Sequence, residues 1–372
     1  MTKVKFEDVA TRVNTREDRL NTSLLYYVGG EHIESNEMLV QGCGLIKGST
    51  IGPMFYCGFK KGDILLVSRN PHLRKASMVE FDGICSEKTF VLGTKDSKVL
   101  LQEFLALVMQ SDDFWNYCEE HKSGGVNYFL NWSTLAKYEF YLPSIQEQKE
   151  IADKVWSAYR LKESYKKLLV ATDEMVKSQF IEMFENVESY CKLEDLVSDT
   201  FPGEWGSEPI SENAIKVIRT TNFTNEGYLD LTDVVTRDIE PKKVVRKKLK
   251  QGDTILERSG GTKDNPVGRV VFFDEIGDYL PNNFTQVLRP KESVNPVYLF
   301  YALYNSYNLN KAAMRAMASQ TTGIQNLSMS DFMAKFIVLP SRNEQNKFEQ
   351  IYRQADKSKF ELKQCIENID KV

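Results

Sequence analysis

The chain has 372 residues, which is more than one hydrophobic core of usual size accommodates, so its length predicts two domains. Apolar residues make up 42% and charged residues 27%, a composition typical of a soluble globular protein. The net charge of −4 argues mildly against a polyanionic partner. Because no apolar run is long enough to span a bilayer and the N-terminus lacks the apolar core of a signal peptide, we expect a cytoplasmic protein.

Cysteine and histidine spacing argues against a metal site. The six cysteines are scattered without a C-x-x-C pair, and the three histidines do not stand at ligand spacing from any of them. We therefore expect free, buried thiols, no metal and no cofactor.

The first elements in chain order are short strands and turns. VKFEDV (Val4 to Val9) opens the chain, and GDILLVS within the stretch that follows Lys60 is typical of a strand, because it is rich in branched apolar residues and bounded by Gly and Ser. Apolar residues three and four apart predict a helix over Val99 to Cys118. LNWSTLAKYEFYLP (Leu130 to Pro143) then leads into LPSIQEQKE.

The same phrases return later in the same order. CKLEDL at Cys191 follows VKFEDV by 187 positions, and KQGDTIL at Lys250 follows KKGDILL by 190. LSMSDFMAKFIVLP at Leu327 follows its counterpart by 197 and again leads into an LPS phrase, LPSRNEQNK. A second helix is expected over Asn295 to Met314, with Pro296 at an early helical position. Ordered matches at growing offsets indicate a tandem duplication with loops of different length.

Each LPS phrase predicts the start of a long helix. Ser144 and Ser341 are N-cap residues, and Glu147 and Glu344 three positions later complete capping boxes. Apolar residues then follow a four-three spacing typical of a coiled-coil seam, interrupted at the same place by Lys162 and Lys359. The predicted seam residues are Ile151, Val155, Ala158, Tyr165, Leu169, Phe348, Tyr352, Ala355, Leu362, Ile366 and Ile369.

The first helix is expected to run to about Phe184, and the second is about a third shorter. Pairing the two in-phase stripes in antiparallel fashion buries both, and would place the globular parts at opposite ends of a dumbbell with approximate two-fold symmetry. The expected fold is α+β, with two tandem-duplicated α/β domains separated by long helices that form an antiparallel coiled coil. The expected segments are 1–143, 144–186, 187–340 and 341–372.

This order of head, LPxxxEQ helix, head and LPxxxEQ helix resembles the specificity subunit of type I restriction–modification systems. YYVGGEHIE at Tyr26 and IRTTNFTNEG at Ile218 look like an early strand-and-loop element in each target-recognition domain. GGTKDNPVGRVVFFD at Gly260 looks like the central hairpin region. The resemblance covers essentially the whole chain.

The resemblance implies a DNA-recognition subunit without an active site of its own. Each head would read one half of a bipartite double-stranded DNA site, and the helices would act as a spacer and dock two adenine methyltransferase subunits. Whether restriction or motor subunits join stays open. The shorter second helix either weakens one docking surface or leaves it to be completed by Met1 to Asn14.

The side chains expected at DNA are basic residues in loops, with amides for base edges. Ten basic residues against five acids between Arg237 and Arg269 favour such a role for the second head. The candidates in the first head are Lys60, Lys61, Arg69, Arg74, Lys75 and Asn127. The candidates in the second head are Arg219, Lys242, Lys243, Arg246, Lys247, Lys248, Arg258, Lys263, Gln325 and Asn326.

Other function classes remain as alternatives. A catalytic methyltransferase is disfavoured, because DNPVG at Asp264 lacks the second proline and the aromatic residue of a base-flipping tetrapeptide. The glycines show no nucleotide-binding spacing, and a metal-dependent nuclease is not indicated by any set of residues. A two-headed interaction scaffold that does not bind DNA and a specificity subunit of a modification-only or phage-defence complex stay open. Basic loops on both heads favour DNA over the scaffold.

Overall fold

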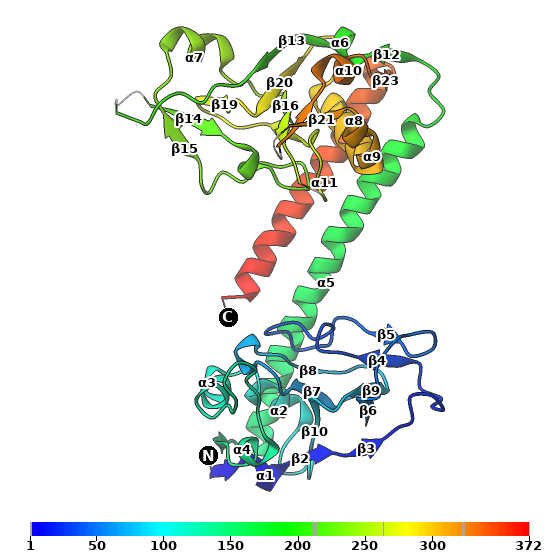
Figure 1. The fold of residues 1–372 in the computed structure, drawn as a ribbon, viewed down its shortest axis with the longest axis vertical. Helices are drawn as coiled ribbons and strands as arrows, with labels where there is room; N and C mark the ends of the chain where they lie inside the picture. Colours follow the sequence, from blue (N-terminus) through cyan, green and yellow to red (C-terminus); the bar gives the residue numbers. More distant parts are fainter. Residues whose placement is uncertain (1, 211–213, 263, 322–323, 372) are drawn as a thin grey trace. The chain divides into compact units, whose positions relative to one another are not determined.

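The computed structural model describes residues 2–371 except 211–213, 263 and 322–323, and it divides the chain into two compact units (Figure 1). Unit 1 comprises residues 1–164 and 369–372, and unit 2 comprises residues 165–368. The border falls inside the long helix α5 (Ile145–Phe184), so this helix contributes to both units. The division into four segments and the dumbbell shape stay predictions.

Unit 1 places small sheets against short helices and the first part of α5. Its elements before α5 are β1 (Thr2–Lys5), α1 (Phe6–Val9), β2 (Ala10–Val13), β3 (Thr15–Arg16), β4 (Tyr26–Val28), β5 (Gly44–Leu45), β6 (Phe55–Phe59), β7 (Ile64–Val67), the 3-10 turn η1 (Pro71–Leu73), β8 (Ala76–Met78), β9 (Gly83–Ser86), β10 (Thr89–Thr94), α2 (Gln102–Val108), α3 (Asp112–Glu120), α4 (Trp132–Leu135) and β11 (Glu139–Leu142).

Unit 2 contains the end of α5 and the second long helix. Its further elements are β12 (Tyr190–Lys192), α6 (Leu193–Leu196), β13 (Val197–Pro202), β14 (Ile215–Ile218), η2 (Thr220–Asn222), β15 (Val235–Arg237), α7 (Pro241–Lys247), β16 (Asp253–Glu257), β17 (Ser259–Gly260), β18 (Val270–Phe273), β19 (Tyr279–Pro281), β20 (Thr285–Pro290), α8 (Pro296–Leu309), α9 (Lys311–Ala316), β21 (Ala318–Thr321), β22 (Ile324–Leu327), α10 (Met329–Met333), β23 (Phe336–Val338) and α11 (Arg342–Ile369).

The strand pairing of the two units confirms the duplication. A four-stranded antiparallel sheet has the order β2-β10-β7-β8 in unit 1 and β13-β20-β16-β18 in unit 2. The first and last strands of each head also pair, β1 with β11 and β12 with β23. A parallel pair recurs as β4 with β9 and β14 with β19. The α+β fold with two duplicated heads is therefore confirmed.

The repeated K-x-G-D phrase forms the same tight turn in both heads. Gly62 and Gly252 adopt φ values of +94° and +95°, a backbone conformation that side chains with a Cβ rarely adopt. Asp63 and Asp253 follow, and each carboxylate accepts the backbone N–H three residues earlier, at 2.8 Å in both turns. The phrase recurs because this turn begins the central strand of each four-stranded sheet.

The starts of α5 and α11 confirm the predicted capping boxes. The Ser144 backbone N–H donates to the Glu147 carboxylate at 2.9 Å, and the Ser341 N–H donates to Glu344 at 2.8 Å. The glutamine that follows each glutamate is present in both copies, and its side chain is buried. Gln148 and Gln345 are 0% and 1% exposed, and each donates its amide to the carbonyl of the proline in its own LPS phrase.

The shorter helices that precede α5 and α11 in the chain differ from the prediction. The stretch Val99 to Cys118 forms two helices, α2 and α3, because Ser111 caps a new helix by accepting the Phe114 N–H. In unit 2, α8 ends at Leu309, and Asn310 caps α9. Pro296 occupies the first turn of α8 as predicted.

The hydrophobic core of each unit includes part of α5. Ala152, Trp156 and Tyr159 join the unit 1 core around Phe6 and Trp115. In unit 2, α8 and α9 lie beside α11 and the end of α5 (Figure 1). The six cysteines are free, but the expectation that all are buried is wrong, because the loop residue Cys43 and Cys365 near the end of α11 are exposed.

Candidate nucleic-acid interface

Three predicted DNA-binding residues of unit 2 meet where β16 ends. Arg258 follows β16, and its carbonyl accepts the Leu327 N–H at 2.8 Å. The next residues form β17, which pairs with the β22 positions Gln325 and Asn326. Ser259 donates its hydroxyl to the Asn326 side-chain oxygen at 2.7 Å. Two amides and one arginine are thus held at one edge by strand pairing, although the arginine is more than 60 residues away from the amides in sequence.

A buried ion pair beneath this edge was not predicted. Glu257 is only 2% exposed, and the Arg269 Nε donates to it at 2.7 Å. The second oxygen of Glu257 lies 3.3 Å from the Gly261 N–H, which begins the adjoining loop. The Glu257 carboxylate therefore links the end of β16 to the start of β18 and to the loop by hydrogen bonds. Nothing in the sequence marks this pair, since its members are 12 residues apart, one at the end of β16 and the other directly before β18.

The loop after β17 requires glycine. Gly261 has φ +67°, and a Cβ there would lie 2.7 Å from the Val267 nitrogen. Gly260 has φ +117°. This backbone lets the chain reverse close to Gln325, whose side-chain oxygen accepts the Val267 N–H at 3.4 Å. Lys263, the predicted cation of this loop, lies outside the described residues.

Unit 1 has a matching edge after β7. The Leu130 N–H donates to the Ser68 carbonyl at 2.8 Å, as Leu327 does to Arg258. The Arg69 guanidinium stands 5.4 Å from the centre of the Phe129 ring, and both residues form an isolated bridge. Asn127 is exposed in the same loop. Arg69 and Asn127 thus lie on the two segments that form this edge in unit 1, and Ser68 occupies the place that Arg258 has in unit 2.

The other candidates of unit 1 lie elsewhere. Lys60 and Lys61 are exposed in the K-x-G-D turn, at the opposite end of β7 from Arg69. Arg74 pairs with Asp112 at 2.7 Å, and Lys75 donates to the Gly30 carbonyl at 2.6 Å. The last two side chains are therefore engaged within the unit, and the five basic residues do not form one patch.

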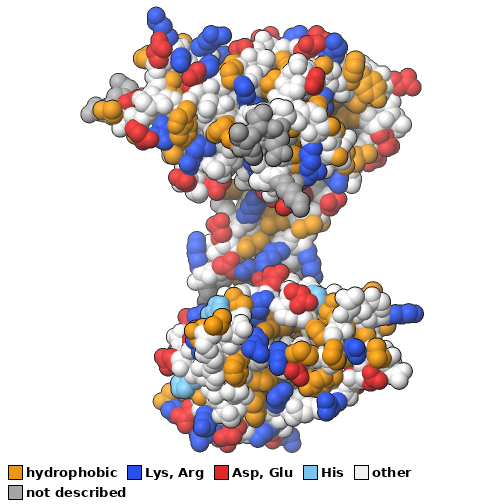
Figure 2. Space-filling view, in the orientation of Figure 1, with side chains coloured by type: hydrophobic (Ala, Val, Ile, Leu, Met, Phe, Trp, Pro, Cys, Tyr) orange, Lys and Arg blue, Asp and Glu red, His pale blue; other side chains and the backbone are white. Residues whose placement is uncertain are grey.

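Five further candidates of unit 2 gather around α7, ahead of β16. Lys243 and Lys247 both pair with Glu204, and the hydrogen bond from Lys247 lowers the pKa of this carboxyl below its ordinary value. Lys248 pairs with Asp278. Lys242 and Arg246 are exposed on the same short helix. Basic and acidic side chains are interspersed on the face of each unit that Figure 2 shows, so the cationic character of this face is local.

Arg219 stands apart from both groups. Its guanidinium pairs with Asp233 at 2.9 Å and also donates to the Asp233 carbonyl at 2.9 Å. Its backbone N–H donates to Asn222, whose amide returns to the Asp233 carbonyl at 3.0 Å. These bonds make Arg219 part of the turn at η2.

The predicted seam is buried in the first half of α11. Phe348, Tyr352 and Ala355 are 0%, 7% and 3% exposed. Leu362, Ile366 and Ile369 are half-buried. The α5 ring of Phe180 lies 5.0 Å from Phe348, whereas Asp173, about two turns earlier, pairs with Lys359 at 2.7 Å. Residues further along α5 contact residues earlier in α11, so the two helices run antiparallel.

The seam of α5 is correct only in part. Ala158, Tyr165 and Leu169 are half-buried. Ile151 and Val155 are 41% and 40% exposed, so their assignment to a buried seam is wrong. The residues that turn inward there are Ala152 and Trp156, because the first turns of α5 pack on the core of unit 1, where Trp156 donates to the Glu103 carbonyl of α2.

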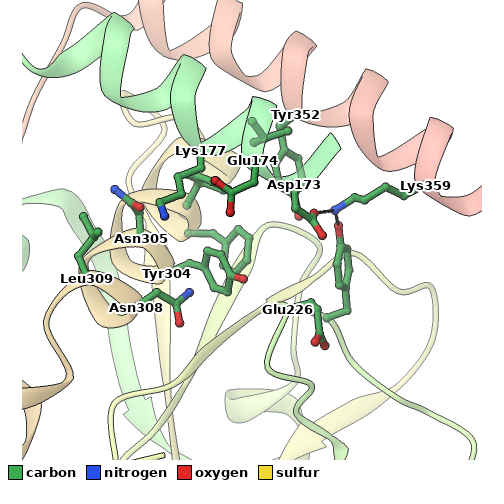
Figure 3. A pocket seen from close by; sticks show the side chains of 14 residues that line it. Asp173, Glu174, Lys177, Glu226, Tyr304, Asn305, Asn308, Leu309, Tyr352 and Lys359 are labelled. Atoms are coloured by element: carbon green, nitrogen blue, oxygen red, sulfur yellow. Dashed lines mark hydrogen bonds and ion pairs between the residues drawn. The ribbon is translucent and has the colours of Figure 1, made fainter. Parts of the chain in front are cut away.

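A cavity of about 230 Å³ lies where α5, α8, α11 and the loop before β15 meet in unit 2 (Figure 3). Lys359, the lysine that interrupts the α11 seam, crosses it to Asp173 and to the Tyr228 hydroxyl at 2.5 Å. Burial raises the pKa of Tyr228 above its ordinary value, so the phenol stays protonated. The shared lysine of the two seams thus forms a buried polar contact in unit 2.

Within the described residues, no group of side chains has the arrangement of a metal site. Over the same residues, none of the helices is both long and apolar enough to cross a membrane.

The sequence matches the type I restriction modification DNA specificity domain over residues 27–169 and again over 200–370. A crystal structure of the S subunit of a type I restriction–modification system from M. genitalium is similar, with TM-score 0.65 and 14% identity over 99% of this chain and 92% of that one. A chain from a structural study of complex assembly and conformational transition of a type I system gives TM-score 0.55 and 17% identity, covering 100% and 94%. Among curated proteins, none matches.

Proposed function

Because this chain belongs to the family of type I restriction–modification DNA specificity domains, we propose that its two heads read the two halves of a split site in double-stranded DNA. The observation that carries this proposal is the recurrence of one loop edge in both units. Arg258, Gln325 and Asn326 stand at this edge in unit 2, and Arg69 and Asn127 stand at the equivalent edge in unit 1.

The residue types at these edges suit base recognition. Arginine pairs with guanine and amides pair with adenine through two hydrogen bonds in the major groove. Strand pairing and the Glu257–Arg269 ion pair hold the backbone, so the side chains that would face bases are attached to a rigid support. Differences between the two edges would let one chain read an asymmetric site.

The basic helix α7 suits phosphate contacts. Lys242 and Arg246 are exposed on it, and phosphate contacts position a protein without specifying sequence. We expect Lys242→Ala to weaken binding of specific and random DNA equally and to reduce the slope of log K against log salt by about one.

The long helices are the proposed docking surface for two adenine methyltransferase subunits. Leu161, Leu168 and Met175 of α5 are 45%, 50% and 42% exposed, and their spacing of seven residues places them on one stripe. Catalysis would then belong to these partner subunits and not to the chain itself. Leu168→Glu should abolish co-purification with the methyltransferase, whereas Leu20→Glu, which changes an exposed loop residue, should not.

The decisive experiment is a map of methylated adenine across the host genome, with and without this gene. Loss of one motif made of two short blocks at a fixed gap is expected. Arg258→Ala and Asn326→Asp should then alter one block only, and Arg69→Ala with Asn127→Asp should alter only the other. Each lost base contact is expected to cost about 1–3 kcal/mol of discrimination.

Matched controls are Lys98→Ala and Lys291→Ala, which change exposed cations distant from the loop edges of units 1 and 2. They should leave both blocks unchanged. An unchanged methylation map after gene deletion contradicts DNA recognition for methylation and favours the interaction scaffold. A changed map in which Arg258→Ala has no effect rejects the proposed edge while keeping the function.

A further inference from the structure

Two cysteines face each other on neighbouring strands of unit 1. β6 and β9 pair antiparallel (Figure 1), and Cys57 of β6 lies directly opposite Cys85 of β9. Residues in direct register project from the same side of a sheet, with Cα atoms about 4.5–5.5 Å apart. A disulfide requires Cα atoms about 4.4–6.8 Å apart, so this register is compatible with a cross-strand bond.

A β-bulge in β6 creates this register. Phe55 pairs with Ser86, whereas the next paired residue of β6 is Cys57, so Tyr56 is the extra residue. Without the bulge, Tyr56 would stand opposite Cys85, and no thiol would face another. The backbone irregularity therefore determines which side chain meets Cys85.

The two thiols differ in exposure. Cys85 is 0% exposed in a core cluster with Val28 and Phe59, whereas Cys57 is half-buried and packs against that cluster. The two side chains are close enough for a hydrogen bond, which Cys85 donates to Cys57. A reagent from solvent therefore reaches Cys57 first, and Cys85 is positioned to react with the product that forms there.

Two arginines favour the thiolate form of Cys57. Arg16 of β3 is the register partner of Cys57 on the side away from β9. The hydrogen bond from Cys85 lowers the pKa of Cys57 below its ordinary value. Arg12 and Arg16 act in the same direction, whereas burial and Glu87 oppose them. The same hydrogen bond, together with burial, raises the pKa of Cys85, so Cys57 ionises first and Cys85 keeps its proton.

Unit 2 has no equivalent of this pair. In the parallel strand pair that both units share, the third paired residue of the second strand is Cys85 in unit 1 and Pro281 in unit 2. The cysteines of unit 2 are Cys191 of β12 and Cys365 of α11, on elements that do not pair with each other. The facing thiols are thus a feature of the first head and not of the shared fold.

We propose that Cys57 and Cys85 form a redox-active dithiol, which small-molecule disulfides oxidise to a cross-strand disulfide. The pair combines the features of a redox-sensing site, which are thiolate character, access from solvent and an adjoining second thiol. The proposal does not depend on DNA recognition, because it rests on strand register and on the surroundings of the two thiols.

The oxidation proceeds by two successive exchanges. The Cys57 thiolate attacks one sulfur of the small disulfide RSSR, so the S–S bond of the reagent breaks, RS⁻ leaves and a mixed disulfide forms on Cys57. Cys85 then attacks the Cys57 sulfur and gives its proton to solvent, which breaks the mixed disulfide and releases a second RS⁻. Both released thiolates take up protons, so two cysteine thiols and RSSR become one protein disulfide and two RSH.

The first test equilibrates the full chain with glutathione and glutathione disulfide, and then identifies the products by acid quenching, alkylation, tryptic digestion and mass spectrometry. Peptides 48–60 and 76–88 carry the two cysteines, and we expect them to be cross-linked. The equilibrium constant for this disulfide should be at least about tenfold larger in the native chain than in the chain unfolded in guanidinium chloride, because the fold holds the two thiols in register.

Two variants separate the roles of the thiols. In Cys85→Ser, a mixed disulfide with glutathione should persist on Cys57, because no second thiol releases it. In Cys57→Ser, Cys85 should stay reduced, because it is 0% exposed. The control is Cys43→Ser, which removes an exposed thiol of unit 1 and should leave the cross-link unchanged. Circular dichroism verifies the folding of each variant, and the measurement on the parent chain depends on none of them.

Three results would overturn the proposal. The first is a native chain in which both peptides stay reduced at excess glutathione disulfide, because the two cysteines would then be ordinary core residues. The second is an equal equilibrium constant in the native and the unfolded chain, because the register would then not favour the bond. The third is a native chain in which Cys57 pairs with Cys43, or retains glutathione, instead of bonding to Cys85.

Discussion

Units 1 and 2 share one strand order, yet they bury their long helices to different extents. Tyr352 of α11 is 7% exposed, whereas Val155 at the equivalent position of α5 is 40% exposed. Both belong to the same four-three stripe, so the pattern itself does not decide burial. What decides it is whether a second helix end, such as Val176–Phe184 in unit 2, covers the stripe.

The K-x-G-D turns differ in a similar way. Asp253 is 1% exposed and forms two hydrogen bonds with Arg289, at 2.8 and 2.7 Å, and this pairing raises the pKa of Arg289. In unit 1 the position of Arg289 is Gly93, and Asp63 is half-buried without such a partner in β10. The same backbone turn thus accommodates a charged pair in one unit and a single carboxyl group in the other.

The largest expected difference concerns the seam. Phe348→Ala should destabilise unit 2 by about 3–5 kcal/mol, because it removes a fully buried aromatic ring. Ile151→Ala at the equivalent position should cost about 1 kcal/mol or less, since this side chain is half-exposed. Hydrogen exchange of core amides in each unit separates the two effects. Equal losses would show that the Ile151 side chain is buried in solution as Phe348 is.

The Arg289–Asp253 pair should have an effect of similar size. Arg289→Met leaves the Asp253 carboxylate buried without its cation, so we expect unit 2 to lose about 3–5 kcal/mol in urea unfolding. Arg353→Met is the control, because Arg353 also pairs with an aspartate, Asp274 at 2.9 Å, but is 50% exposed. Its loss should stay below about 1 kcal/mol. Similar losses for both variants would refute the role of burial.

The buried glutamines should show what the two units have in common. Gln148→Ala and Gln345→Ala each leave a proline carbonyl and a helix-start N–H without their partner. We expect each variant to destabilise its own unit by about 1–3 kcal/mol. Gln146→Ala, at an exposed position in the same turn, should change stability by about 0.5 kcal/mol or less. A large effect at Gln345 alone would contradict the equivalence of the two glutamines.

The smallest effect is a pH dependence at Asp63. Burial raises the pKa of this carboxyl above its ordinary value of 3.8. Its contribution to stability is therefore present below the ordinary value and decreases as the pH rises through the raised pKa. Asp63→Asn should become more stable relative to the parent protein as the pH rises toward 7, by about 0.5 kcal/mol. Thermal unfolding at pH 4 and pH 7 measures this, and the opposite trend would contradict it.

The candidate DNA edge shows which predicted residues the structure brings together and which it engages elsewhere. Arg258, Gln325 and Asn326 were selected by residue type and loop position, and strand pairing brings them together. Lys75 and Arg74 were selected by charge, but they bond within unit 1. Charge in a sequence does not indicate whether a partner from a distant segment is available, which explains these differences. Their DNA contacts stay a prediction.

The sequence alone determined the features that depend on neighbours within a few residues. The turns at Gly62 and Gly252 and the capping boxes at Ser144 and Ser341 follow from local backbone geometry and short-range hydrogen bonds. The duplication is visible in the sequence because these local phrases recur in the same order. Only the tertiary structure decided the break between α2 and α3 within the expected helix, the face of α5 that packs on unit 1 and the buried pair of Glu257 with Arg269. Burial depends on which distant segments cover a surface, and a periodic pattern carries no information about that cover.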